Sequence, residues 1–167
     1  MTYQALVNQH LASARCMLVE GSRQDSANDS LQCACEHSAL HLLNSAYLCQ
    51  LRAIAENYHV EGIPAISDIQ TLLAALVALD ISAPEAAEIA VLVREGWLGG
   101  LLVALQQLCI PTVSPVPNQV IPSVSQSDIT LRDDPRVESL LNIDKLQRWL
   151  LALEELVQRQ VEMMVEY

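Results

Sequence analysis

Residues 31–58 read LQCACEHSALHLLNSAYLCQLRAIAENY, and this stretch decides the fold. Apolar side chains recur in it at intervals of three and four, which is the spacing of residues on one side of an α-helix. One stripe consists of Leu31, Cys35, Leu42, Ala46, Cys49 and Ala53, and a second lies beside it with Leu40, Leu43, Tyr47, Leu51, Ile54 and Tyr58. A stripe this wide predicts a long helix that packs against two neighbours.

The chain before this helix shows the same periodicity. Residues 3–19 place apolar side chains along one broad face, so we expect a first helix over this range, ended by Gly21. Residues 21–30 are rich in Ser, Asn, Asp and Gln, whose side chains favour turns over helix interiors. They are predicted to form the connecting loop.

Two shorter helices are expected after the long one, which Gly62 and Pro64 interrupt. Ser67 followed three residues later by Gln70 has the form of a capping box, and it predicts a helix that continues to about residue 79. Ser82 is the predicted N-cap of the next helix.

Pro84 then stands in the first turn of that helix, where its missing N–H is not needed, and Glu85 completes its capping box. Gly96 is expected to end or bend it. The pattern is again helical over residues 97–109, although Gly99 and Gly100 lie inside it. Because interior glycines cost about 1 kcal/mol each relative to alanine, we interpret them as a place of close helix contact.

Residues 110–135 contain five prolines, at 111, 115, 117, 122 and 135, so most of this stretch cannot be helical. Its valines and isoleucines predict an extended strap that lies over the bundle. After a short turn started by Asp134 and Pro135, Asn142 or Asp144 is expected to open a last amphipathic helix with an apolar stripe from Leu146 to residue 164.

These elements together predict an all-α protein. We expect a mainly antiparallel bundle of five or six helices, with the proline-rich strap before the last one. The two longest helices are predicted at residues 31–58 and 142–165. With 167 residues, of which 51% are hydrophobic, the chain is long enough for one domain with a real core, and we expect residues 1–167 to form a single unit.

The composition limits the classes of partner. Charged residues make up only 17% of the chain, with 20 acidic residues against 9 basic ones and a net charge of −11. Such a charge repels phosphate backbones, which argues against a nucleic-acid ligand. The apolar balance predicts that a partner protein, including a second copy of the chain as a homodimer, covers part of its surface.

The cellular compartment is predicted from cysteines and targeting signals. Cys16, Cys33, Cys35, Cys49 and Cys109 are an odd set that lies in helical patterns, which is not typical of a secreted disulfide scaffold. The first residues lack the pattern of a signal peptide, and the apolar runs stop short of the ~18 residues of a membrane span. We therefore expect a cytoplasmic protein with no membrane span.

Several short stretches carry a family resemblance. They are Tyr3, Asn8-Gln9, residues 54–58 with the sequence IAENY, Trp97-Leu98, the proline-rich strap and the closing helix with Trp149. Together they resemble a family of uncharacterised helical proteins from gammaproteobacteria, catalogued as a domain of unknown function. The resemblance implies a bacterial cytoplasmic helical protein, and it implies no substrate, cofactor or catalytic residue.

The sharpest local cluster of chemically active side chains is Cys33, His37 and His41, which follow one another at intervals of four. One helix face can therefore present a thiolate and two imidazoles to a metal ion, with a further ligand needed from another helix. The alternative is that Cys33 packs as a small residue while the histidines lie at the helix surface, and this alternative is favoured.

Arg52 and His59 form a second candidate pair. Six residues separate them, as in the Arg-to-His motif of HEPN ribonucleases, and seven positions return to the same face of a helix. An arginine can hold a phosphate while a histidine moves a proton. The alternative is that Arg52 pairs with Glu56, one turn further on, and that His59 lies near the helix C-terminus.

No phosphate-binding loop, nucleophile elbow, dinucleotide fingerprint or paired-cysteine zinc spacing occurs in the sequence. The predicted function is therefore a protein-interaction or structural helical bundle with no cofactor, and catalysis is not predicted. The alternative is a metal-binding or HEPN-like RNA-processing bundle that uses Cys33, His37 and His41 or Arg52 and His59.

Overall fold

The computed structural model describes residues 2–23, 29–109 and 141–165. These residues form six α-helices and one short 3₁₀ turn, with no strand among them, so the all-α prediction is confirmed. The elements are α1 (Tyr3–Ser22), α2 (Asp29–Asn57), η1 (Ile63–Ala65), α3 (Ile69–Ala78), α4 (Pro84–Glu95), α5 (Trp97–Cys109) and α6 (Ile143–Val165). The predicted strap at 110–135 and the turn at residues 134–141 lie almost wholly outside the described residues.

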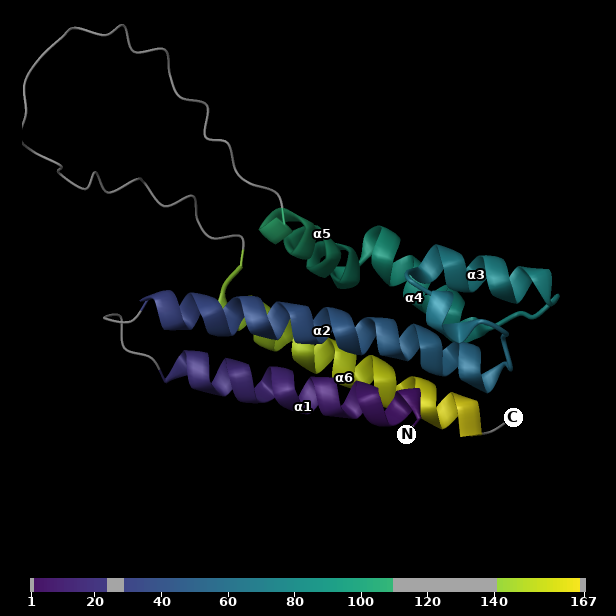
Figure 1. The fold of residues 1–167 in the computed structure, drawn as a ribbon, viewed down its shortest axis with the longest axis horizontal. Helices are drawn as coiled ribbons and strands as arrows, with labels where there is room; N and C mark the ends of the chain where they lie inside the picture. The colour runs from purple at the N-terminus through teal and green to yellow at the C-terminus, as the bar shows by residue number, and fades with distance from the viewer. Residues whose placement is uncertain (1, 24–28, 110–140, 166–167) are drawn as a thin grey trace, which may run out of the picture.

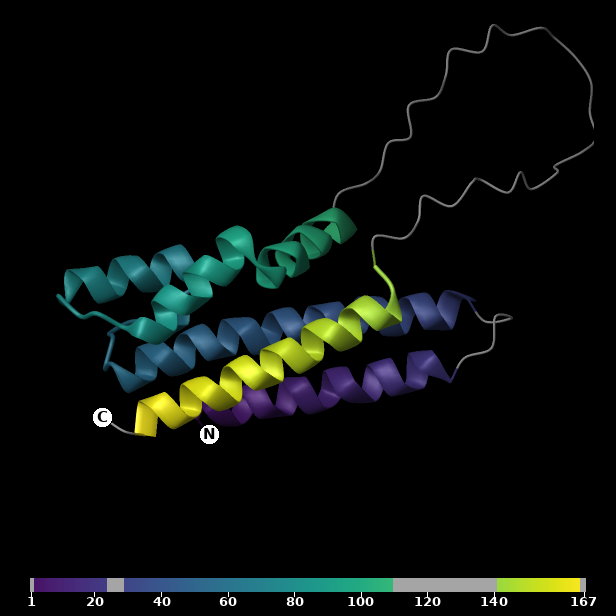
Figure 2. The same ribbon diagram turned by 180° about the vertical axis from the view of Figure 1, so that it is seen from behind.

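The three longest helices, α1, α2 and α6, contact one another pairwise and together form the first layer (Figure 1, Figure 2). The N-terminal end of α1 lies beside the C-terminal end of α2, because the Tyr3 amide donates a hydrogen bond to Glu56 Oε2 at 3.4 Å. At the other end of α1, Ser22 accepts a hydrogen bond from Gln147 of α6. Helix α1 is therefore antiparallel to both neighbours, while α2 and α6 run in the same direction.

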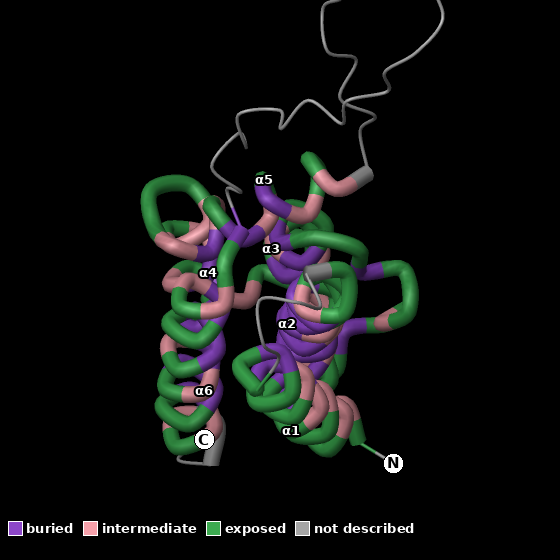
Figure 3. Tube along the Cα trace, turned by 90° about the vertical axis from the view of Figure 1, so that its left-hand side faces the viewer, coloured by how far each residue is buried: buried purple, intermediate pink, exposed green. Residues whose placement is uncertain are grey.

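The shorter helices α3, α4 and α5 form a second layer over α2 and α6 (Figure 1). Figure 3 shows buried residues on the inner sides of the helices and exposed residues outside. The two layers share one apolar core. Its largest fully buried side chains are Leu18, Leu40, Leu43, Leu51, Ile54, Leu72, Leu76, Ile89, Leu98, Leu101, Leu146 and Leu153. The apolar stripes predicted from the sequence thus supply the core.

Small residues bring α1 and α2 close together. Two residues of α2 contact α1: Cys35 approaches Gly21, and Glu56 binds Tyr3. The residues between them at intervals of three and four therefore lie along the α1 side of α2. The buried residues along this side are Cys35, Ala39, Ala46, Cys49 and Ala53, and α1 buries Val7, Leu11, Ala14, Leu18 and Gly21. We call the contact between these two sets the small-residue seam.

Gly21 does not end the first helix, so that prediction is wrong. Helix α1 continues to Ser22, and Arg23 is its C-cap. A Cβ atom on Gly21 would lie 3.1 Å from Cys35 Cβ and 3.2 Å from Ile143 Cδ1. A glycine fits at this position because α1, α2 and α6 meet there and leave little room for a side chain. The residue predicted as a helix stop therefore serves tertiary packing.

Two predicted N-caps are displaced by one residue. Asp68, not Ser67, caps α3: its carboxylate accepts a hydrogen bond from the Thr71 amide at 2.7 Å, and Thr71 Oγ1 accepts one from the Asp68 amide at 3.1 Å. The predicted box with Gln70 is therefore wrong in register. A carboxylate makes a charge-assisted bond to the amide, which favours Asp68 over the neighbouring hydroxyl.

The N-cap of α4 is Ala83, which makes no side-chain capping bond, so the prediction of Ser82 is also wrong. Because a residue before proline is driven away from helical backbone angles, the helix can begin only at Pro84. Glu85 does not complete a capping box. It is 1% exposed and turns toward the core.

The other predicted helix ends are confirmed. Gly96 is the C-cap of α4, and Asn142 opens α6 by accepting a hydrogen bond from the Lys145 amide at 2.8 Å. The close contact predicted at the double glycine is also present. A Cβ atom on Gly99 would lie 2.3 Å from the carbonyl oxygen of Val93, so glycine lets α5 begin directly against the end of α4.

Candidate functional site

A groove of about 710 Å³ runs along the surface between α1 and α6. Its lining residues are Gln4, Asn8, Leu11, Ala12, Arg15 and Cys16 of α1 together with Glu154, Val157, Gln158, Val161 and Glu162 of α6. On each helix these residues recur at intervals of three and four, so that each helix contributes one continuous wall. Among the described residues, no other helix lines the groove.

Side-chain size explains why the groove exists. The α1 wall has small residues at Ala12 and Cys16, both exposed, where larger side chains would fill the space. The floor is apolar, because Leu11 and Val157 belong to the core and are only 5% and 4% exposed. An apolar floor between two helices is the kind of surface that receives another helix.

A charged pair bridges the groove at its end near Cys16. One guanidinium nitrogen of Arg15 lies 2.6 Å from each carboxylate oxygen of Glu154. The hydrogen bond and the negative charge of Glu154 raise the pKa of Arg15 above its ordinary value. This pair fixes the spacing of the two walls at that point and leaves this part of the groove without net charge.

The groove continues into a hollow of about 390 Å³ at the end of the layer. Gln4 and Val161 line both, and the hollow adds Thr2, Ala53, Glu56, Asn57 and His59. Within the described part of the chain, Gln4 Oε1 is inaccessible to solvent and has no hydrogen-bond partner.

The predicted metal ligands lie near the beginning of α2, and all three are exposed. Cys33 Sγ is 3.5 Å from His37 Nε2, so the first two do contact each other. Among residues 2–23, 29–109 and 141–165, no group of three or more His, Cys, Asp or Glu side chains is arranged to hold a metal ion. The metal site at Cys33, His37 and His41 stays a prediction.

Arg52 and His59 do not share a helix face. Helix α2 ends at Asn57, and His59 follows it with a left-handed φ of 55°, so the seven-residue spacing has no helical meaning there. Arg52 donates hydrogen bonds to the carbonyl oxygens of Ile66 at 3.2 Å and Pro64 at 3.5 Å. It supports the η1 turn.

The alternative pairing of Arg52 with Glu56 is not what the structure shows, since Glu56 accepts the hydrogen bond from Tyr3. His59 instead lines the hollow at the end of the groove. The ribonuclease chemistry predicted from the Arg52 and His59 spacing therefore lacks the shared face on which it depended.

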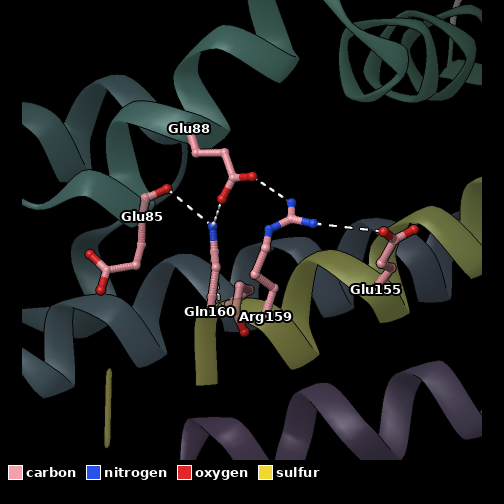
Figure 4. A network of polar contacts seen from close by, with 6 residues as sticks. Glu85, Glu88, Glu155, Arg159 and Gln160 are labelled. Atoms are coloured by element: carbon pink, nitrogen blue, oxygen red, sulfur yellow. Dashed lines mark hydrogen bonds and ion pairs between the residues drawn. The ribbon is translucent and has the colours of Figure 1, made fainter. Parts of the chain in front are cut away.

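A polar network joins α2, α4 and α6 inside the molecule (Figure 4). Gln160, which is fully buried, accepts a hydrogen bond from Gln50 Nε2 at 3.0 Å and donates to the Glu85 carbonyl at 3.2 Å and to Glu88 Oε2 at 3.1 Å. Arg159 binds the other carboxylate oxygen of Glu88 and also pairs with Glu155 at 3.8 Å. We call this the interlayer polar network.

Sequence reasoning missed both the groove and this network. Gln50 and Gln160 each occupy a position on an apolar stripe, with Tyr47 and Ile54 around the first and Leu153 and Val157 before the second. A polar residue at a core position is a signal for a buried hydrogen bond. The groove had no such signal, because an exposed small residue such as Ala12 occurs in many structural settings and does not by itself indicate a groove.

No helix in the described ranges is both long and apolar enough to cross a membrane. No curated protein matches the chain, and no solved structure matches it. One family model does match, over residues 1–167, and it is described as a family of unknown function, DUF6586. This agrees with the resemblance seen in the sequence, whereas the gammaproteobacterial origin stays a prediction. By this match over its whole length, the chain belongs to the family of unknown function DUF6586.

Proposed function

We propose that this chain is a protein-interaction bundle of one domain, and that the α1–α6 groove receives an apolar helical segment of a partner protein. The observation that carries the proposal is an open groove of about 710 Å³ with an apolar floor between walls formed by the antiparallel helices α1 and α6. A helix seated there would contact α1 and α6 as a fourth long helix beside the layer of three.

The groove surface favours a protein ligand over a small polar one. Leu11, Ala12 and Val157 offer aliphatic contacts, and the one strongly basic group, Arg15, is already bound by Glu154. Burying aliphatic surface stabilises a complex by roughly 25 cal/mol for each Å² removed from water. A continuous apolar strip on the partner helix therefore supplies the binding free energy.

The cytoplasm is the compartment that we propose for this activity. Cys16, Cys33, Cys35 and Cys49 are all free thiols. Unpaired cysteines, two of them exposed, fit a compartment in which thiols are kept reduced.

The test uses groove and control variants as baits in a pull-down from a lysate of the source organism. Quantitative mass spectrometry compares the amounts of each protein that the baits capture. Ala12→Glu places a charge on the apolar groove. Ala74→Glu makes the same change at an exposed alanine of α3, outside the groove. We expect a stoichiometric partner that the wild type and Ala74→Glu retain and Ala12→Glu loses. Equal capture by Ala12→Glu, or recovery of the bait alone, would overturn the proposal.

Sedimentation equilibrium of the same three proteins separates a partner protein from a second copy. We expect the wild type and both variants to sediment alike. A wild-type dimer that Ala12→Glu dissociates would overturn the assignment to a different protein and place a second copy of the chain in the groove.

A further inference from the structure

The two halves of the groove differ in charge. In the half near Cys16, Arg15 and Glu154 neutralise each other at 2.6 Å. In the other half, with the adjoining hollow, the described lining residues include Glu162 and Glu56, and none of them is lysine or arginine. This half therefore carries a net negative charge that the groove itself does not compensate.

Resting on the proposed function, we infer that the segment bound by the groove is an amphipathic helix with lysine or arginine at one end, and that this basic end lies over Glu56 and Glu162. Its apolar strip follows the floor at Leu11 and Val157. The α1 wall spans the twelve residue steps from Gln4 to Cys16, about 18 Å at 1.5 Å per residue, so the docked helix has roughly three to four turns.

The experiment measures binding of two synthetic 14-residue peptides to the full chain by fluorescence anisotropy. Both carry leucines at intervals of three and four. One has lysines in its last turn and the other has glutamates at the same places. We expect the basic peptide to bind at least about 5-fold more tightly at low salt, and we expect the difference to shrink in 0.5 M NaCl because salt screens exposed charges.

Two charge variants locate the effect. Glu162→Gln removes a carboxylate from the groove and is expected to weaken the basic peptide about 2- to 5-fold. Glu155→Gln makes the same change seven residues, about two turns, earlier on α6, where the carboxylate pairs with Arg159 (Figure 4), and it should leave the binding of both peptides unchanged. Equal loss in the two variants would overturn the assignment to Glu162.

Disulfide trapping determines which end of the bound helix lies near Cys16. Cys16 is exposed in the neutral half of the groove, and Cys33→Ser removes a second exposed thiol, on α2. A cysteine at the non-basic end of the peptide should form a disulfide with Cys16, whereas one at the basic end should not. Trapping of the basic end, or of both ends equally, would overturn the orientation.

Ala12→Glu separates the failure of this inference from that of the proposed function. If both peptides bind equally and Ala12→Glu weakens both, the groove is an interaction site and the basic end is wrong. If neither peptide binds at 100 µM (about −5.5 kcal/mol), or Ala12→Glu has no effect on either, the groove proposal itself is overturned.

Discussion

The small-residue seam between α1 and α2 and the interlayer polar network between α6 and α4 hold neighbouring helices by different means. The seam is apolar, and it relies on alanine, cysteine and glycine to bring two long helices close together. The network relies on Gln160, whose side chain bonds to α2 and to α4 at once. The seam and the glutamines of the network are both buried, so burial alone does not tell how a helix is held.

This difference in the kind of contact indicates which helices separate at a lower free energy. Apolar contacts are non-directional and tolerate small shifts, whereas a buried hydrogen-bond network loses stability when any one partner is removed. We therefore expect α1 and α2 to form the most stable unit of the protein, and α4 to detach from α6 at a lower free energy.

Leu18→Ala is expected to have the largest effect. Leu18 is 2% exposed in α1, and its truncation leaves a cavity beside the seam that should lower the free energy of unfolding by about 2–5 kcal/mol. Urea denaturation measures this. Val19→Ala, at the next residue and 46% exposed, is the control and should cost under about 1 kcal/mol. Similar losses in the two variants would contradict the buried role of Leu18.

Gln160→Ala tests the polar network and should lower the free energy of unfolding by about 1–3 kcal/mol, since it leaves Gln50 Nε2 buried without its acceptor. Gln158→Ala, at an exposed residue of the same helix, is the matched control. Hydrogen exchange should show faster exchange in α4 than in α1 for the Gln160 variant. Uniform acceleration over both helices would show that the layers do not open separately.

A double replacement sharpens the same test. Changing Gln50 and Gln160 together to leucine removes the donor and its acceptor, so no group of that pair is left unsatisfied. We expect the double variant to be more stable than Gln160→Ala, because an apolar pair of similar size can replace a buried polar pair at little cost. A double variant less stable than Gln160→Ala would mean that Gln160 matters chiefly through Glu85 and Glu88.

Asp68→Ala removes the N-cap of α3 in the second layer and should cost about 1 kcal/mol. The Thr71 backbone amide is the main cause that lowers the pKa of Asp68 below its ordinary 3.8. A lowered pKa means that the stabilisation is present above pH 3.8 and is lost as the pH falls through the folded-state pKa.

Denaturation curves at pH 7 and at pH 3 and below measure this contribution. The difference between wild type and Asp68→Ala should narrow at low pH. Asp68→Asn, which keeps a capping oxygen but does not titrate, is the control. A difference that persists unchanged at low pH would show that the cap does not depend on the carboxylate charge.

Tyr47→Phe should have the smallest effect at neutral pH, under about 1 kcal/mol. Burial on the α3 side of α2 is the main cause that raises the pKa of Tyr47 to about 12. The stability contributed by the protonated phenol is therefore complete below pH 10 and is lost between about pH 10 and 12.

Alkaline denaturation measures this loss, which Tyr47→Phe should not show. Tyr3→Phe, at the start of α1, is the matched control and should follow the wild type. Should wild type and Tyr47→Phe lose stability together above pH 10, ionisation of this phenol is not what weakens the contact between α2 and α3.

Several features of the fold follow from local sequence. The stripes at residues 31–58 and 146–164 predicted the two longest helices, and Gly96, Pro84 and Asn142 marked helix ends correctly. Caps at Ser67 and Ser82 were wrong by one residue each, because Asp68 binds the Thr71 amide in place of Ser67 and because Pro84 fixes the start of α4. Gly21 was misread because a glycine that stops a helix and one that admits another helix look alike in sequence.

The candidate site was far less accessible to prediction. The chemically active residues singled out, Cys33, His37 and His41 in one set and Arg52 with His59 in the other, all lie outside the α1–α6 groove, and of these His59 reaches the adjoining hollow. The groove depends on exposed small residues and on the distance between two helices that are more than 120 positions apart in the chain, and neither has a spacing that a sequence displays.

The sequence by itself determined that this protein is helical, where most helices lie, which side of each is apolar, and that its charge is strongly negative. These properties depend on residues within a turn or two of each other, so short-range periodicity and composition express them. The tertiary structure alone decided that α2 and α6 run in the same direction, that Gln50 meets Gln160, and that α1 and α6 leave a groove with one acidic end. Many apolar stripes are chemically equivalent partners, and only the packing of the whole chain selects which of them meet.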